Sequence, residues 1–143
     1  MKKKNSALAR ELASQQNWFC HYCTLPMTDS SVKSKNLDSA VTTEHLIPRS
    51  KQGSNAPPNL KAACKLCNNL RKCSSHTDFK IVVTTLLLSP RMEEQWHNLD
   101  SQQRKELNQE IQSSLKQLQL KRSQEQQEQQ NILGMRPQTV SGL

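Results

Sequence analysis

Aromatic residues are scarce in this sequence of 143 residues. They make up 3% of it, and only 34% of all residues are hydrophobic. A chain of this length fits one domain with room for an appendage, but its compact part has few large side chains with which to fill a core. We therefore expect something other than apolar packing to help hold the fold together.

Long apolar runs are also missing. The longest, Ile81 to Leu88, is far shorter than the roughly 20 residues that a membrane-spanning helix needs. Lys2 to Lys4 resemble the start of a signal peptide, but Arg10 and Glu11 stand where its apolar segment should run. We therefore expect no membrane span and a cytoplasmic location, where cysteines stay reduced and available as metal ligands.

Acidic residues are few in the first part of the chain. Residues 1–80 carry 13 Lys and Arg against 5 Asp and Glu, whereas residues 81–143 carry 7 of each kind. The net charge of +8 therefore lies entirely in the first part, which favours a nucleic acid as its partner. A basic bias that serves only solubility is the alternative.

Cysteine, in contrast, is plentiful and regularly spaced. Cys20 and Cys23 form one CxxC pair, and Cys64 and Cys67 form a second. Two residues between ligands let a tight turn aim both sulfurs at one ion, and four thiolates suit a closed tetrahedral Zn²⁺ site. A redox dithiol is the alternative, but two such pairs in one basic chain favour structural zinc.

The two pairs enclose a long insertion. It spans 40 residues, Thr24 to Ala63. Because structural zinc can contribute on the order of 10 kcal/mol to folding, it would supply what the small core lacks. The fifth cysteine, Cys73, is expected to be a free thiol, and His21 and His76 are expected to be ordinary surface histidines.

The sequence pattern predicts an α+β fold. We expect a helix capped by Ser6, a loop over residues 27–39, a strand over 40–47, an irregular segment over 48–59, a short extended piece and a helix that starts near Cys67. The expected domains are a basic tip and helix at 1–19, a zinc-holding domain at 20–80, a helical extension at 81–133 and a flexible tail at 134–143.

The extension carries one clear apolar stripe. Asp100 and Gln103 form a candidate capping box, and the stripe follows at helical spacing with Leu107, Ile111, Leu115 and Leu118. Such a stripe is typical of a packing or dimerising helix. We therefore expect either packing within the chain or self-association through the helix at 100–120.

One ordered set of residues resembles a known family. A CxxC pair is followed by "EHLIPRSKQG", which begins with Glu44 and His45, then by Asn59 and Leu60, and then by a second CxxC with Asn68 directly after it. This combination, from Cys20 to Lys72, resembles the HNH endonucleases. The resemblance implies a small ββα-metal domain stapled by zinc, which hydrolyses phosphodiester bonds in DNA and leaves 5′-phosphate and 3′-hydroxyl ends.

The resemblance also implies a role for each matching residue. His45 would be the general base, and Asn59 would orient it and brace the loop. Glu44 and Asn68 would bind the catalytic ion, and two oxygen ligands suit Mg²⁺, with Mn²⁺ as a substitute. Neighbouring residues on a regular strand face opposite ways, so Glu44 and His45 can serve one site only where the strand twists or ends.

The sequence departs from the commonest family pattern at three positions. Glu44 stands where Asp is frequent and Asn68 where His is frequent, and both keep an oxygen donor. Gln52 stands where a second glycine often precedes Gly53, which leaves the path of the loop open.

Basic residues near these positions are candidate phosphate contacts, namely Arg49, Lys51, Arg71 and Lys72. Two alternatives to a nuclease follow from the same residues. One is a zinc-stapled module that binds nucleic acid without cleaving it, and the other is an interaction protein that self-associates through its apolar stripe.

Overall fold

The computed structural model describes residues 2–29 and 37–141, with side chains over residues 6–29 and 37–134. Its elements are α1 (Lys2–Gln15), β1 (Val41–His45), the short 3-10 helices η1 (Arg49–Lys51) and η2 (Pro57–Asn59), β2 (Leu60–Cys64), α2 (Lys65–Arg71), α3 (His76–Leu86), α4 (Pro90–Gln95) and α5 (Ser101–Ser141). The fold is α+β, as the sequence predicts. Residues 30–36 of the expected loop lie outside the described residues.

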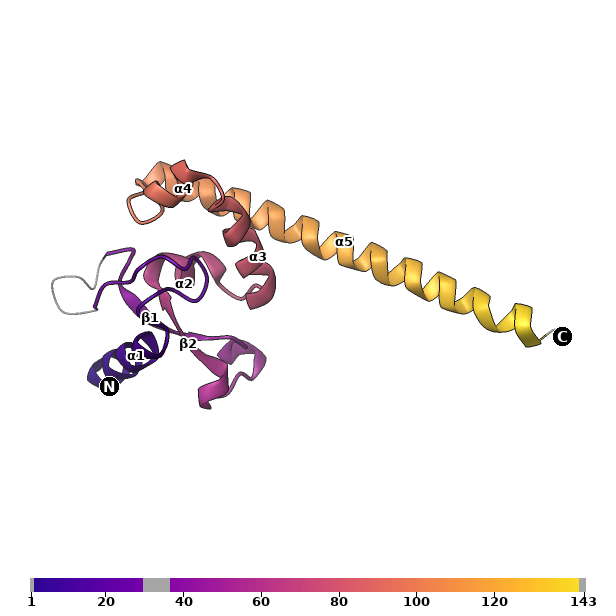
Figure 1. The fold of residues 1–143 in the computed structure, drawn as a ribbon, viewed down its shortest axis with the longest axis horizontal. Coiled ribbons are helices and arrows are strands. Elements are labelled where there is room, and N and C mark those ends of the chain that lie inside the picture. Colours follow the sequence, from indigo (N-terminus) through magenta and orange to yellow (C-terminus); the bar gives the residue numbers. More distant parts are fainter. Residues whose placement is uncertain (1, 30–36, 142–143) are drawn as a thin grey trace.

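The hairpin of β1 and β2 is the centre of the compact part. Its strands pair antiparallel, with Glu44 opposite Lys61 and His45 opposite Leu60. α2 lies against β1, because its residues Asn68 and Arg71 donate hydrogen bonds to Thr42 and Glu44. Figure 1 shows α1, the hairpin and α2 gathered together, with α3 and α4 above them.

α1 is longer than expected and is tied to the hairpin. It begins at Lys2, so Ser6 lies inside the helix and the prediction of an N-cap there is wrong. Leu12 and Ala13 are buried in the same cluster as Ala62 of β2. Just after the helix, the side chain of Gln16 donates to the Ala62 carbonyl at 2.9 Å and accepts from its N–H at 2.7 Å. This side-chain amide therefore binds both backbone groups of Ala62, as the backbone of a neighbouring strand would.

The capping box and the apolar stripe of α5 are confirmed. The backbone N–H of Gln103 donates to Asp100 Oδ1 at 2.8 Å, and the N–H of Asp100 donates to Gln103 Oε1 at 2.9 Å. Leu107, Ile111 and Leu115 are buried, and α5 packs on α3. The stripe is therefore used within the chain, which is the first of the two uses that the sequence left open.

Two ion pairs fasten α5 to the rest of the chain. Arg104 Nη2 lies 2.8 Å from Asp38 Oδ2, and Arg122 pairs with Asp78 at the start of α3. Both carboxylates are buried and both arginines are about half exposed. The two pairs hold the proximal half of α5 at both of its ends.

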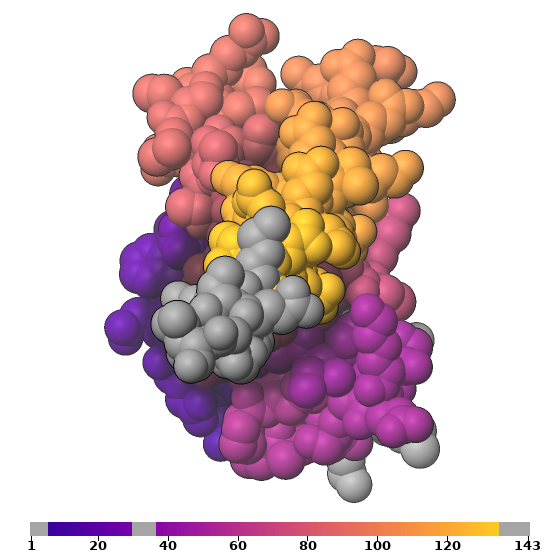
Figure 2. Space-filling model, turned by 90° about the vertical axis from the view of Figure 1, so that its right-hand side faces the viewer, coloured from indigo at the N-terminus to yellow at the C-terminus, as the bar shows by residue number. Residues whose placement is uncertain are grey.

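The distal half of α5 leaves the compact part. All side chains described from Gln119 to Gly134 are exposed, among them Leu120, Ile132 and Leu133. The helix continues through Gly134 to Ser141, where we expected a tail without regular structure. It projects to the right in Figure 1 and stands in front of the body in the end-on view of Figure 2. None of the described helices is long and apolar enough to cross a membrane.

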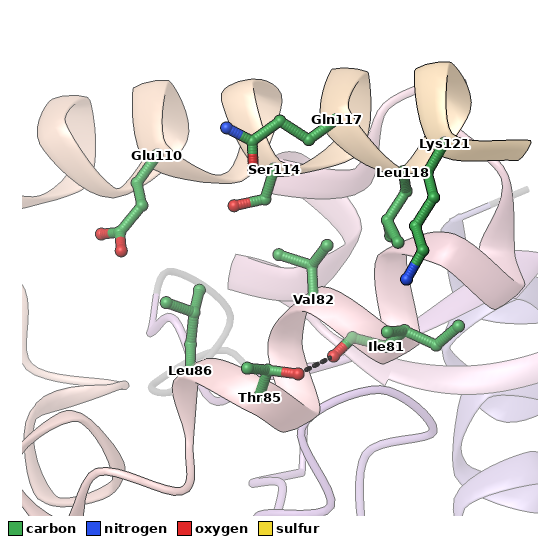
Figure 3. Close-up of a pocket in the computed structure, with 9 residues that line it drawn as sticks. All are labelled: Ile81, Val82, Thr85, Leu86, Glu110, Ser114, Gln117, Leu118 and Lys121. Carbon is green, nitrogen blue, oxygen red and sulfur yellow. Dashed lines mark hydrogen bonds between the residues drawn. The ribbon is translucent and has the colours of Figure 1, made fainter. Parts of the chain in front are cut away.

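A cavity of about 390 Å³ lies between α3 and α5 (Figure 3). Val82, Leu86 and Leu118 give it apolar walls, and Glu110 and Lys121 are the charged residues that line it. It is formed by the helical extension and contains none of the site residues that the sequence predicts.

Candidate active site

The four cysteines of the two CxxC pairs meet in one buried cluster. Their sulfur atoms all lie within 4.8 Å of one another, and Cys23 Sγ is 3.9 Å from Cys64 Sγ. Four sulfurs bound to one tetrahedral Zn²⁺ at about 2.3 Å would lie at comparable separations. Cys73 is exposed and outside this cluster, as expected.

The local backbone is arranged for thiolates. The N–H of Tyr22 donates to Cys20 Sγ at 3.4 Å, the N–H of Cys64 donates to the same sulfur at 3.3 Å, and the N–H of Cys67 donates to Cys64 Sγ at 3.4 Å. Burial raises the pKa of the Cys67 thiol, so only a bound cation makes its thiolate favourable at neutral pH. The donor set and its enclosure fit a structural zinc ion.

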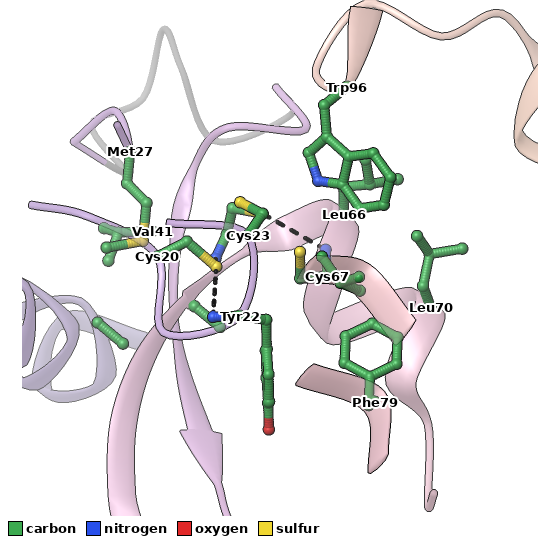
Figure 4. Packing of buried hydrophobic residues seen from close by; sticks show 14 of the residues in the cluster. Cys20, Tyr22, Cys23, Met27, Val41, Leu66, Cys67, Leu70, Phe79 and Trp96 are labelled. Carbon is green, nitrogen blue, oxygen red and sulfur yellow. Dashed lines mark hydrogen bonds between the residues drawn. The ribbon is translucent and has the colours of Figure 1, made fainter. Parts of the chain in front are cut away.

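Apolar side chains enclose the cysteine cluster (Figure 4). Trp96, from the turn after α4, is fully buried beside Leu66 and Cys67. Tyr22 packs edge-on against Phe79 of α3, with ring centroids 5.0 Å apart. The helical extension therefore completes the core around the cysteines, although it lies far from them in the sequence.

The loop after β1 turns on two residues, Gln52 and Gly53. Gln52 has φ 66°, the left-handed conformation that a glycine would adopt more easily. A Cβ on Gly53 would lie 1.7 Å from the Ile47 carbonyl oxygen, so only glycine fits there. Gln52 therefore holds a left-handed conformation at a cost in backbone strain.

Asn59 braces this loop from its other end. Its Oδ1 accepts from the N–H of Ile47 at 2.8 Å, while its Nδ2 donates to the carbonyls of Ile47 at 3.1 Å and Ser54 at 2.8 Å. One side chain therefore holds both branches of the loop together. The contact with His45 is indirect, because Asn59 fixes the residues that follow His45 and precede Asn55.

His45 is the last residue of β1 and is partly exposed. Its Nε2 lies 2.9 Å from Oδ1 of Asn55, a loop residue that sequence reasoning did not single out. A ring nitrogen facing an amide oxygen carries the proton, which leaves the other nitrogen as the basic one. The strand ends here, as the geometry of the Glu44–His45 pair requires.

Arg71 holds that strand end in place. Its Nη1 donates to Glu44 Oε1 at 2.9 Å and to the His45 carbonyl at 2.6 Å, and its Nη2 donates to the Leu46 carbonyl at 2.6 Å. Its Nε donates to the carbonyl of Ser74 at 2.9 Å. The side chain is only 1% exposed, so Arg71 is a buried positioning residue and not the phosphate contact that the sequence suggested.

Glu44 is buried with one carboxylate oxygen in use. Oε1 pairs with Arg71, whereas Oε2 has no hydrogen-bond partner among the described residues. Burial raises the pKa of Glu44, and the charge of Arg71 opposes that shift. The Tyr22 hydroxyl and the His45 N–H also act on this carboxylate and lower its pKa, so Oε2 can take either a cation or the buried Tyr22 hydroxyl as its partner.

Asn68 lies on the same side of the hairpin as Glu44. Its Nδ2 donates to Thr42 Oγ1 at 3.0 Å and to the Thr43 carbonyl at 3.3 Å. Because the nitrogen is used in this way, the amide oxygen is the atom of Asn68 that could bind a metal ion. Asn68 and Arg71 are three residues apart on α2, so both side chains face β1.

The sequence of this part of the chain matches the model of a known protein family. The HNH endonuclease family model matches residues 20–72. We call this matched segment the HNH domain. The match includes both CxxC pairs, the Glu44–His45 pair, Asn59 and Asn68, and it leaves α1 and the helices from α3 onward outside. A search of curated proteins found no match to the chain.

The other expected phosphate contacts of the HNH domain lie at its surface. Arg49, Lys51 and Lys72 are exposed, and Lys51 Nζ donates to the Cys73 carbonyl at 3.2 Å. Sequence reasoning missed the positioning role of Arg71, the contact of Asn55 with His45 and the bracing by Gln16. The spacing of Arg71 from Asn68 was a usable signal, because it places both on one face of α2.

Proposed function

We propose that the HNH domain is a metal-dependent endonuclease that hydrolyses phosphodiester bonds in DNA. The observation that carries the proposal is the placement of His45 at the end of β1, partly exposed and with one ring nitrogen facing Asn55. An imidazole placed in this way can accept a proton from water on the ring nitrogen that does not face Asn55. The basic charge of residues 1–80 suits a polyanionic substrate.

Glu44 and Asn68 are proposed to hold the catalytic Mg²⁺ or Mn²⁺, through Oε2 and the amide oxygen. When bound, such an ion neutralises the charge that builds on the phosphoryl group and on the leaving oxygen. Arg71 contributes by keeping Glu44 ionised and correctly placed. Asn59 contributes by holding the loop that carries Asn55, and family resemblance gives 5′-phosphate and 3′-hydroxyl products.

The zinc ion of the four cysteines is proposed to be structural and separate from the catalytic ion. It has a closed set of four protein ligands, which leaves no position for water or substrate. A reducing compartment such as the cytoplasm would keep these thiols available. A zinc-stapled module that only binds nucleic acid would share this part of the structure, but it gives no reason for the His45–Asn55 contact.

Nicking of supercoiled plasmid in Mg²⁺ tests the metal-binding part of the proposal. Glu44→Gln and Asn68→Ala are expected to need more Mg²⁺ than wild type for the same rate, because each loses a ligand. Asn69→Ala is the matched control, since Asn69 is the exposed neighbour of Asn68. If Glu44→Gln and Asn68→Ala respond to Mg²⁺ as the control does, these residues are not its ligands.

A further inference from the structure

The cavity between α3 and α5 opens to solvent along a partly apolar rim. Ile81 of α3 is 48% exposed, and Leu86 of α3 and Leu118 of α5 are only partly buried. Figure 3 shows Leu86 and Leu118 directed into the space between the two helices. Apolar side chains at the rim of an open cavity are typical of a contact site.

The charged residues of this cavity stand at the two ends of one helix face. Glu110 and Lys121 are exposed and line the cavity from α5, with Ser114 and Gln117 between them (Figure 3). They are about three helical turns apart, so their side chains leave the helix on the same side. Within the described part of the chain, neither of them forms an ion pair. This face of α5 therefore presents one negative and one positive group to a partner.

The charge pattern of this face is complementary to itself. When a second copy of α5 lies antiparallel across the first, a two-fold axis through the midpoint of the two charges brings each Glu110 to the partner's Lys121. The same axis brings Ser114 to the partner's Gln117, and the small Ser114 lets the two helices approach closely. A parallel copy would instead set like charges against each other. The pattern therefore selects a second copy of this chain, in antiparallel orientation, as the occupant.

The projecting half of α5 gains a neighbour in the same arrangement. Its described side chains from Gln119 to Gly134 are all exposed, although Leu120, Ile132 and Leu133 are apolar. In an antiparallel pair, the residues that follow the axis in one copy lie beside the residues that precede it in the other. The projecting half therefore runs along the first turns of the partner's α5. This lengthens the contact beyond the cavity, toward the roughly 1,200–2,000 Å² that a stable interface buries.

We propose that two copies of this chain form a dimer through this face of α5, with the ion pair between Glu110 and the partner's Lys121 present twice. The face differs from the apolar stripe that the sequence predicted, since Leu107, Ile111 and Leu115 of that stripe are buried within the chain. The second helix covers the exposed apolar rim of the cavity. The HNH domain takes no part in the contact, so the dimer does not depend on the proposed nuclease function.

Sedimentation equilibrium of the full chain tests the proposal by exchanging the two charges. Wild type is expected to form a dimer. Glu110→Lys alone sets lysine against lysine twice, and Lys121→Glu alone sets glutamate against glutamate twice. Each is expected to raise the dimer Kd by about tenfold or more, because two attractions become two repulsions. The double variant Glu110→Lys with Lys121→Glu restores both ion pairs in exchanged form and should return the Kd to within about threefold of wild type.

Lys116→Glu is the matched control, because Lys116 is an exposed lysine of α5 that does not line the cavity. It should leave the Kd of the dimer unchanged, and circular dichroism checks the helix content of every variant. A wild-type chain that stays monomeric at high micromolar concentration would overturn the proposal and leave this face to a partner of another kind. A dimer that the single variants do not weaken, or that the double variant does not restore, would overturn it as well.

Discussion

Arg71 connects three parts of the site through one guanidinium group. It binds Glu44 and the two carbonyls that follow it, and so fixes the point where β1 stops. This solves the problem that two adjacent strand residues cannot face the same way. Glu44 faces α2 inside the fold, whereas His45 ends the strand next to the loop.

Replacing Arg71 is expected to destabilise the protein strongly. Arg71→Ala leaves the Glu44 carboxylate buried without its partner, which costs about 3–5 kcal/mol of unfolding free energy. Urea denaturation of the zinc-loaded protein measures this loss. Arg49→Ala, at an exposed position of the same charge, should change stability by less than about 0.5 kcal/mol. Equal, small effects of both substitutions would contradict the positioning role.

Replacing Gln52 at the strained turn is expected to stabilise the protein. Gln52→Gly should stabilise the protein by up to about 1 kcal/mol, because the left-handed conformation costs a side-chain residue roughly 1–2 kcal/mol and glycine recovers part of that. Gly53→Ala should destabilise it, since the new Cβ would collide with the Ile47 carbonyl. Thermal melts of the two variants decide this, and a Gln52→Gly protein that melts lower than wild type would refute it.

The residue types and their order were enough to predict much of this site. The spacing of the four cysteines predicted their cluster, whereas the positions of Asn59 and Asn68 were singled out by the resemblance to the HNH family and their roles stay predictions. The contacts of Arg71 and of Asn55 were not predictable in the same way, because they depend on how the loop folds back over the strand end. An arginine can pair with a DNA phosphate or with a buried carboxylate. Only the burial of Arg71 in the structure distinguishes these two roles.

Among the elements, the two CxxC turns and α2 meet at the four-cysteine cluster, which is consistent with a structural zinc site. Cys64 ends β2, caps α2 and belongs to the metal cluster, so it joins three elements at one residue. We expect one Zn²⁺ per chain by metal analysis. Cys64→Ser should lose both the metal and the fold, since structural zinc supplies on the order of 10 kcal/mol.

Cys73→Ser is the matched control for that substitution, because Cys73 is exposed and outside the cluster. It should keep the zinc and the circular dichroism spectrum of wild type. A Cys64→Ser protein that also kept both would show that the four sulfurs are not a structural metal site.

The long helix α5 divides into a packed half and a projecting half. A chain ending at Ser123 keeps Leu107, Ile111 and Leu115 and both ion pairs, and should melt within a few degrees of wild type. A chain ending at Asp100 loses the helix that packs on α3 and uncovers Val82 and Leu86, which line the cavity between the two helices, and should melt much lower. Equal melting temperatures for the two truncated chains would contradict this division.

The sequence predicted that an apolar stripe would exist but left open what it packs against. Its period gives the helix face, whereas the partner depends on α3 and on two buried aspartates, Asp38 and Asp78, far away in the chain. The continuation of α5 beyond residue 133 was missed because residues 134–143 contain two glycines and a proline and carry no apolar period, which is typical of a tail. The first case shows that a local sequence pattern can predict a helix and its apolar face but cannot predict which element packs against that face.

At the scale of the whole molecule, the HNH domain shares one hydrophobic core with α1 and with the helices that follow it. Trp96, after α4, and Phe79 of α3 lie outside residues 20–72, and both are completely buried in the same cluster as the cysteines. The charge is distributed differently, since the excess of basic residues stays in residues 1–80. The extension therefore packs against the domain and adds no net charge to it.

The most direct test of this account compares wild type, His45→Ala and Asn69→Ala for nicking of supercoiled plasmid in Mg²⁺. Wild type and Asn69→Ala should nick at equal rates, whereas His45→Ala should be slower by about 10²–10⁴-fold, the usual contribution of a general base. Correct folding of each protein is checked by its zinc content. If wild type does not nick the plasmid, or if His45→Ala nicks it as fast as wild type, the account of this site is wrong.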